Sequence, residues 1–112
     1  MSEVFYMKDT QDIEPTDDGL TIHNAERILR EHGGYEWALT GKKFWSVGEV
    51  VAALNEAGLP VGEAKVRQWF AVVKTHWPAH WQDLKGTYGW RISRTGLLLM
   101  LAAQTAEGQS LI

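Results

Sequence analysis

The sequence predicts one α+β domain that is mainly helical and carries a small β-hairpin. Three segments, residues 22–32, 47–57 and 63–77, place apolar side chains at the spacing of an amphipathic helix. Further along, Trp90 and Ile92 alternate with a polar residue, which is typical of a short strand. The chain has 112 residues, the usual length of one domain.

The composition excludes several classes of protein. The chain contains no cysteine, which rules out disulfides, thiolate zinc sites and cysteine nucleophiles. Its longest apolar run, Leu97 to Ala103, has seven residues, whereas a membrane span needs about 20. The N-terminus lacks the basic and apolar regions of a secretory signal. We therefore expect a soluble, cytoplasmic protein with no membrane partner.

Residues 1–20 are expected to form an acidic, flexible tail. The stretch from Asp9 to Gly19 is polar and acidic and contains Pro15, so it cannot bury enough apolar surface to order itself. The apolar segment Val4 to Met7 leaves open a short strand that packs on the core.

The first expected helix runs from Ile22 to His32. Thr21 is a suitable N-cap, and Gly33 and Gly34 are a strong signal for the end of a helix.

The segment from Tyr35 to Trp45 is ambiguous. Large apolar residues alternate over residues 35–39, and Thr40 and Gly41 then turn the chain. Residues 43–45 are consistent with one short strand.

The next two helices form a pair. Ser46 and Glu49 match a capping box, which begins a helix over residues 47–57. After a four-residue turn that contains glycine, a second helix covers residues 63–77, and Pro78 ends it. Two amphipathic helices joined in this way are typical of a helix-turn-helix.

A hairpin is expected after the helix pair. Its strands cover residues 81–84 and 90–92 around a loop at 85–89, with a tighter turn at Lys85 and Gly86 as an alternative. Most of the six tryptophans fall on predicted inner faces, where core packing explains them.

The last helix is expected over residues 95–107, with Thr95 as its N-cap, Gly108 as its end and a tail at 109–112. It is apolar around most of its circumference, so it must be buried on more than one side. Either the N-terminal segment or a second copy of the chain would supply the second surface. We expect a homodimer through this helix, with the contact made by Leu97, Leu98, Met100 and Leu101.

This order of elements resembles the winged helix-turn-helix fold over residues 21–108, with an extra C-terminal helix. Within it, residues 44–100 are similar to the DNA-binding domains of MerR-type regulators and of phage or plasmid excisionases. The matching pieces are S-V-G-E-V, V-R-Q-W and G-W-R-I-S-R followed by an apolar helix. The turn and the second helix are longer here than in that family.

The resemblance implies a sequence-specific protein that binds double-stranded DNA. It would be a small transcriptional regulator or a recombination and excision accessory factor of a mobile element, associated with the nucleoid. The helix at 63–77 would enter the major groove and the 85–89 loop would be the wing. Arginine and lysine read guanine and glutamine pairs with adenine, so the base-reading candidates on the polar face are Lys65, Arg67 and Gln68.

Other candidates lie farther along this surface. Nearer the phosphates on the same helix we expect Lys74 and Thr75. The expected wing contacts are Lys85, Thr87, Tyr88, Arg91 and Arg94, and further backbone contacts are expected from Lys42 and Lys43.

The charge distribution leaves a second function open. The net charge is −3, but residues 1–40 carry three Lys and Arg against nine Asp and Glu, and residues 41–96 carry eight against four. The alternative is a protein-interaction module on a winged-helix scaffold, whose acidic N-terminal part binds a basic partner or inhibits its own basic face.

An enzyme is not expected. No Ser-His-Asp spacing stands out, and the acidic pair Asp17 and Asp18 lies in the expected tail, whereas catalytic carboxylates need a fixed position. His76 and His80 are four apart, but Pro78 interrupts the helix between them and no third ligand is near. We therefore expect no metal and no cofactor.

Overall fold

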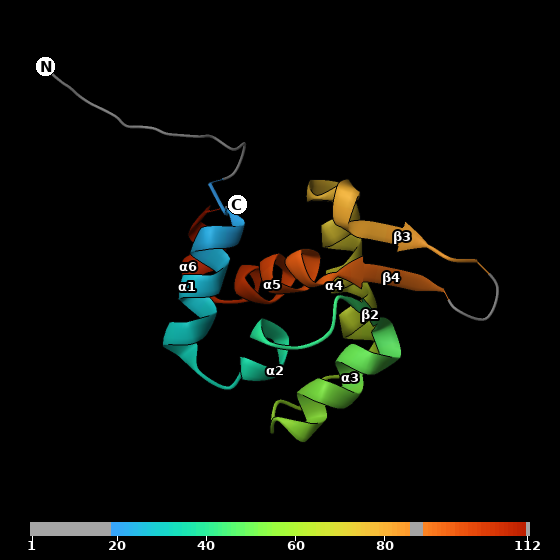
Figure 1. Ribbon diagram of the computed structural model, residues 1–112, viewed down its shortest axis with the longest axis horizontal. Coiled ribbons are helices and arrows are strands. Elements are labelled where there is room, and N and C mark those ends of the chain that lie inside the picture. Colours follow the sequence, from blue (N-terminus) through green and yellow to red (C-terminus); the bar gives the residue numbers. More distant parts are fainter. Residues whose placement is uncertain (1–18, 86–88, 112) are drawn as a thin grey trace, which may run out of the picture.

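The computed structural model describes residues 19–85 and 89–111 (Figure 1). Its elements are α1 (Ile22–His32), α2 (Glu36–Leu39), β2 (Phe44–Ser46), α3 (Val47–Glu56), α4 (Glu63–His76), the single 3-10 turn η1 (Pro78–His80), β3 (Trp81–Asp83), β4 (Trp90–Ser93), α5 (Arg94–Ala103) and α6 (Ala106–Leu111). The expected class, mainly helical with a small antiparallel sheet, is confirmed. Most of the expected tail, the possible strand at 4–7, and the loop positions Thr87 and Tyr88 lie outside the described residues.

The first helix has the predicted bounds. The Thr21 hydroxyl caps α1 by accepting from the Asn24 amide at 3.2 Å, and Gly33 ends it with a φ of 76°. Leu20, which was assigned to the predicted tail, is 1% exposed and belongs to the core.

The ambiguous segment contains the short helix α2, which the alternation of large residues obscured. The Tyr35 carbonyl accepts from the amides of Ala38 and Leu39 at 3.0 and 3.2 Å. The turn that follows needs Gly41, because a Cβ there would lie 2.2 Å from the Trp37 carbonyl oxygen. Glycine therefore lets α2 pack closely on the start of β2.

The capping box of α3 forms as predicted. The Ser46 hydroxyl accepts from the Glu49 amide at 3.2 Å, and the Glu49 carboxylate accepts from the Ser46 amide at 2.9 Å. At the other end, Gly58 has a φ of 84° and the Leu59 amide donates to the Leu54 carbonyl at 2.8 Å. This closing pattern satisfies the last carbonyls of α3 and turns the chain toward α4.

Glu49 also makes α3 sensitive to acid. Its pKa lies below the ordinary value of 4.5, first because the Lys42 ammonium donates to its carboxylate and next because the Ser46 amide does. A lowered pKa stabilises the fold above pH 4.5, and that contribution is lost as the pH falls through the folded-state value.

We expect Glu49→Gln to lower the free energy of unfolding by about 0.5 kcal/mol at pH 7, since a glutamine can still cap the helix but carries no charge. The two proteins should converge in urea titrations below the folded-state pKa. Glu56→Gln, at the other end of α3, is the matched control, because no described cation lies within ion-pair distance of Glu56. It should leave the free energy of unfolding at pH 7 nearly unchanged. A Glu49→Gln effect of equal size at both pH values would contradict the assigned cause.

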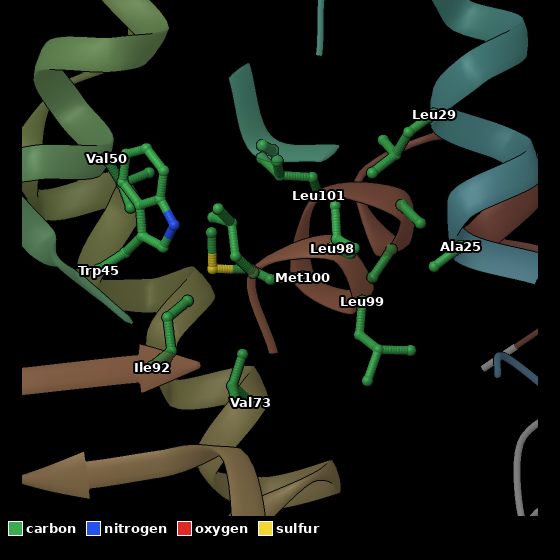
Figure 2. Close-up of a cluster of buried hydrophobic side chains, with 14 of the residues drawn as sticks. Ala25, Leu29, Trp45, Val50, Val73, Ile92, Leu98, Leu99, Met100 and Leu101 are labelled. Carbon is green, nitrogen blue, oxygen red and sulfur yellow. The ribbon is translucent and has the colours of Figure 1, made fainter. Parts of the chain in front are cut away.

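The three strands form one antiparallel sheet in the order β2-β4-β3. Trp45 and Trp81 both pair with Ile92, so the inner face of the sheet is apolar. The helices α4 and α5 cover that face, and Ile92 points toward Val73 and Met100 (Figure 2). Strand alternation therefore turns Phe44, Arg91 and Gln82 to the opposite face.

Helix α5 lies at the centre of the molecule, between α1 on one side and α4 on the other (Figures 1 and 2). Every residue from Gly96 to Ala103 is buried. The expected second surface for this apolar helix is thus supplied by the same chain, by α1, α2, α4 and α6. The predicted dimer contact through Leu97, Leu98, Met100 and Leu101 is wrong for these side chains, which are at most 2% exposed within one chain.

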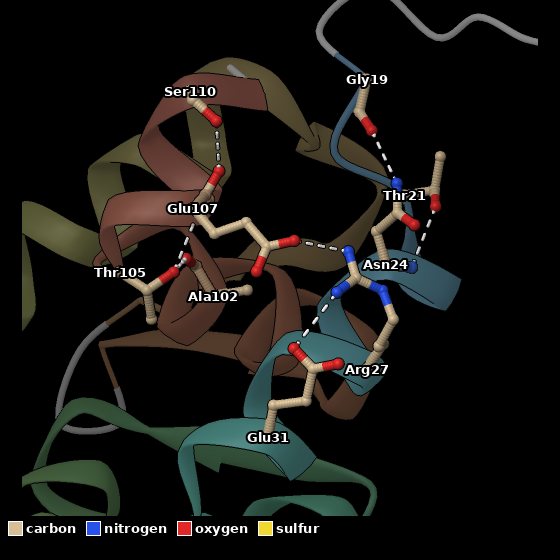
Figure 3. Close-up of polar contacts among 10 residues, drawn as sticks. Gly19, Thr21, Asn24, Arg27, Glu31, Ala102, Thr105, Glu107 and Ser110 are labelled. Atoms are coloured by element: carbon tan, nitrogen blue, oxygen red, sulfur yellow. Dashed lines mark hydrogen bonds and ion pairs between the residues drawn. The ribbon is translucent and has the colours of Figure 1, made fainter.

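The predicted helix at 95–107 is two helices. Ser93 rather than Thr95 is the N-cap of α5, since its hydroxyl accepts from the Gly96 amide at 3.1 Å. The first helix ends at Ala103, and Thr105 begins the next by donating to the Ala102 carbonyl at 2.7 Å and accepting from the Gly108 amide at 3.0 Å (Figure 3).

Helix α6 continues beyond its predicted end. Gly108 lies buried inside α6, and residues 109–111, predicted as a tail, are helical. Arg27 of α1 holds this helix through Glu107 at 2.6 Å and also contacts Glu31 at 3.3 Å (Figure 3). The Glu107 carboxylate accordingly raises the pKa of Arg27.

Candidate nucleic-acid interface

The outer face of α4 carries the residues predicted to read bases. Val66, Phe70 and Val73 anchor the helix in the core, which leaves Lys65, Arg67 and Gln68 exposed near its N-terminal end. This arrangement follows from the helical repeat, because these positions are offset from the apolar stripe. All three predicted base-reading residues are thus exposed on α4, with Lys65 and Gln68 one turn apart and Arg67 on the neighbouring row with Glu63.

The two cations on this surface differ, because one forms an ion pair within the helix and the other does not. The Arg67 guanidinium donates to the Glu63 carboxylate through Nε at 3.0 Å and Nη2 at 2.8 Å, one turn earlier on the helix. In the described part of the chain, no carboxylate lies within ion-pair distance of Lys65. Lys65 is therefore the unneutralised cation of the predicted reading surface.

The C-terminal half of α4 faces the hairpin. The Lys74 ammonium lies 4.9 Å from the centre of the Trp81 ring, which connects α4 to β3. The Thr75 hydroxyl donates to the Ala71 carbonyl at 2.9 Å, so its hydrogen is already engaged. Both side chains are exposed, as the prediction of phosphate contacts requires.

The predicted wing is a short antiparallel hairpin. The Leu84 amide donates to the Gly89 carbonyl at 2.8 Å, and the backbone then turns at Lys85 with a φ of 67°. Asp83 stabilises that left-handed residue by accepting from its amide at 2.9 Å, and the Lys85 ammonium lies 3.7 Å from the same carboxylate. Lys85 therefore projects from the base of the loop with its charge partly balanced.

The two arginines expected after the loop lie on different elements. Arg91 is in the middle of the central strand β4, on its outer face, as the alternation along the strand predicted. Arg94 is the first residue of α5, and its guanidinium donates to the carbonyls of Gly41 and Lys42. Since these bonds hold the loop before β2, the contacts that Arg94 makes within the chain are structural.

The lysines before β2 differ from each other. Lys42 pairs with Glu49 and lies 5.1 Å from the centre of the Trp45 ring. Lys43 is exposed, and its carbonyl accepts from the Arg94 amide at 2.7 Å. Both lysines were predicted to contact the DNA backbone. Of the two, Lys43 is the one with no carboxylate in ion-pair range among residues 19–85 and 89–111.

The described part of the chain is positive, and most of its unpaired cations lie on α4 and around the sheet. Residues 19–111 contain ten Lys and Arg against eight Asp and Glu, a net charge of +2, whereas residues 1–18 contain one against six. The described cations with no carboxylate within ion-pair distance are Arg30, Lys43, Lys65, Lys74, Arg91 and Arg94. All but Arg30 belong to α4, to the sheet or to the chain next to it.

Neither a metal centre nor a membrane span emerges from the described residues. They contain no group of three His, Asp or Glu side chains placed to hold a metal ion. His80, one of the two histidines considered from the sequence, instead bonds to the Ser93 hydroxyl through Nδ1 at 2.9 Å. In the same part of the chain, no helix has the length and apolarity needed to cross a bilayer.

Comparisons with known proteins leave the resemblance to winged helix-turn-helix domains as a hypothesis. No protein-family model matches the chain, and no similar protein was found among curated sequences or solved structures. The case for a function therefore rests on the fold and on the charged surface described above.

Proposed function

We propose that the protein binds double-stranded DNA in a sequence-specific manner, with α4 in the major groove. The observation that carries this proposal is the exposed N-terminal half of α4, where Lys65, Arg67 and Gln68 all face solvent on a helix anchored by a buried stripe. These side chains can pair with guanine and adenine edges. The capped helix α3 and a short turn support α4 from behind, as in a helix-turn-helix.

The hairpin supports the proposal through its position. Lys74 connects α4 to β3 through the Trp81 ring, so the first strand of the hairpin begins beside α4. Lys85 at the base of the loop would contact phosphates and fix the register of α4 in the groove. A small regulator or recombination accessory factor acting on cytoplasmic DNA would use both elements in this way.

Charge segregation favours a second candidate function, a protein-interaction module. The first 18 residues have a net charge of −5 and the rest of the chain is positive, so this segment could bind a basic protein or compete with DNA. The two functions differ in their behaviour toward DNA, since only the first predicts binding of duplex DNA with an affinity that falls steeply as salt is raised.

The double variant Lys65→Glu/Arg67→Glu tests DNA binding. We expect it to lower affinity for random-sequence duplex DNA by about 100-fold or more at low salt, because each reversal removes a contact and adds repulsion. Its dependence of log affinity on log salt should also be shallower. Fluorescence anisotropy with a labelled duplex pool measures both quantities.

Arg30→Glu is the matched control. Arg30 is also an exposed cation without an ion pair in the described structure. It lies on α1, which is separated from α4 by α5 (Figure 1). It should leave affinity within about twofold, since it lies outside the reading surface. The proposal would be refuted if the affinity for duplex DNA changed neither with salt concentration nor with the substitutions in α4.

A further inference from the structure

The outer face of the sheet carries an aromatic and polar row that the proposed duplex interface does not use. Gln82 on edge strand β3 pairs directly with Arg91 on central strand β4. Phe44 on edge strand β2 has Ser93 as its pairing partner and contacts Arg91 diagonally across the same face. Phe44 is 45% exposed, which makes it the most exposed large apolar side chain of the described residues. Since α4 and α5 pack on the inner face, this row points away from them.

The Arg91 guanidinium is held in a defined orientation. Its centre lies 4.2 Å from the centroid of the Phe44 ring, and the Gln82 side-chain oxygen accepts from its Nε at 3.0 Å and its Nη2 at 2.5 Å. Those two bonds occupy one edge of the fork. The Nη1 hydrogens and the second Nη2 hydrogen remain for another acceptor.

A guanidinium held in this way is suited to an external anion. No carboxylate of the described residues lies within ion-pair distance of Arg91 or of Lys43, which precedes Phe44 in the chain. Gln82 is neutral, so it orients Arg91 without cancelling its charge. An arginine restrained by stacking and by an amide loses less conformational freedom when it binds a phosphate.

We propose that this sheet face is a binding site for a single nucleic-acid strand. One base stacks on the exposed part of the Phe44 ring, and the adjoining phosphate binds the free edge of Arg91, with Lys43 adding positive charge. Exposed aromatics beside cations are the recurrent means of binding unpaired bases, because every base has a stacking face. The charge of the row matches a polyanion, and the site does not depend on the duplex interface of α4.

The test uses the full chain and a fluorescent 12-nucleotide thymidine strand in anisotropy titrations at low salt. Phe44→Ala should weaken binding of the strand by about tenfold, the scale of one lost base stack. Arg91→Lys keeps the charge but loses the stacked fork, and should also weaken binding. Leu84→Ala is the matched control for Phe44, because Leu84 is similarly exposed, at 39%, yet lies outside the row. Urea midpoints establish that each variant is folded.

A second comparison separates the two surfaces. Lys65→Glu/Arg67→Glu should leave binding of the single strand within about threefold while it weakens duplex binding by about 100-fold or more. Phe44→Ala should weaken binding of the single strand by about tenfold and leave duplex binding within about threefold. If the wild type does not bind the thymidine strand, or if Phe44→Ala and Leu84→Ala behave alike, the sheet-face site is refuted whatever the outcome for duplex DNA. Saturation by a phosphopeptide but not by the strand would likewise overturn it.

Discussion

Replacing Leu98 with lysine is expected to unfold the protein rather than to separate a dimer. Leu98 is 2% exposed at the centre of α5 and is surrounded by helices of the same chain. An unpaired ammonium there would lose its hydration and find no carboxylate in the apolar core of Figure 2. The cost should be at least roughly 5 kcal/mol, which is comparable to the whole stability of a small domain.

Circular dichroism and analytical ultracentrifugation together measure this outcome. Wild-type protein should show a cooperative thermal transition, and Leu98→Lys should show none or a greatly lowered midpoint. Gln104→Lys is the matched control on the exposed C-cap of the same helix, and it should change the midpoint by only a few degrees. If Leu98→Lys were folded and had half the wild-type mass, that result would instead support the predicted dimer interface through α5.

The second large effect is expected for Gly108→Ala. A Cβ at Gly108 would lie 1.8 Å from the Ala102 carbonyl oxygen and 2.6 Å from its carbon, so α6 could not keep its present position against the end of α5. The clash is with backbone, which cannot rotate away. We expect a loss of roughly 2–3 kcal/mol in the free energy of unfolding, the range of overpacked cores.

Urea denaturation measures this loss, and Ser110→Ala provides the comparison in the same helix. Ser110 is exposed and its hydroxyl only donates to the Glu107 carbonyl at 2.7 Å, so its removal should change stability by no more than about 0.5 kcal/mol. If Gly108→Ala were as mild as Ser110→Ala, α6 would not pack backbone to backbone on α5.

The helices α1, α3 and α4 could be predicted because their signals are local. Thr21 and Ser46 cap helices within four residues of themselves, and the apolar spacing continues along each helix. A capping residue and a periodic stripe act through the nearest turns, so a sequence window contains the relevant atoms. The same reason explains why the sequence predicted which residues of α4 are exposed.

The C-terminal helix shows where local reasoning fails. A glycine at position 108 is a common signal for the end of a helix. Here Gly108 lies inside α6, and a side chain is excluded because α6 approaches the carbonyl of Ala102. The apolar circumference of α5 indicated two covered sides, but a sequence window cannot distinguish a second copy from other helices of the same chain. That choice depends on contacts between α1 and α5, which lie far apart in the sequence.

The candidate site divides in the same way. Exposure of Lys65 and Gln68 follows from helical spacing, whereas the roles of Arg91 and Arg94 follow from their partners. Strand alternation indicated that Arg91 points away from the core, but its contacts with Phe44 and Gln82 come from two different strands. Sequence reasoning missed Phe44 and Gln82. Each is the chain neighbour of an inward-facing tryptophan, and a strand of three residues is too short for that alternation to be a clear signal.

The sequence by itself determined the class of fold, the capped helices α1 and α3, and a basic outer face on α4. Each of these depends on interactions between residues a few positions apart. Only the tertiary structure decided that α5 is the core of one chain, that Arg94 binds the loop before β2, and that Arg91 lies between Phe44 and Gln82. The physical reason is that burial and side-chain pairing depend on distances in space, which the packing of distant segments creates.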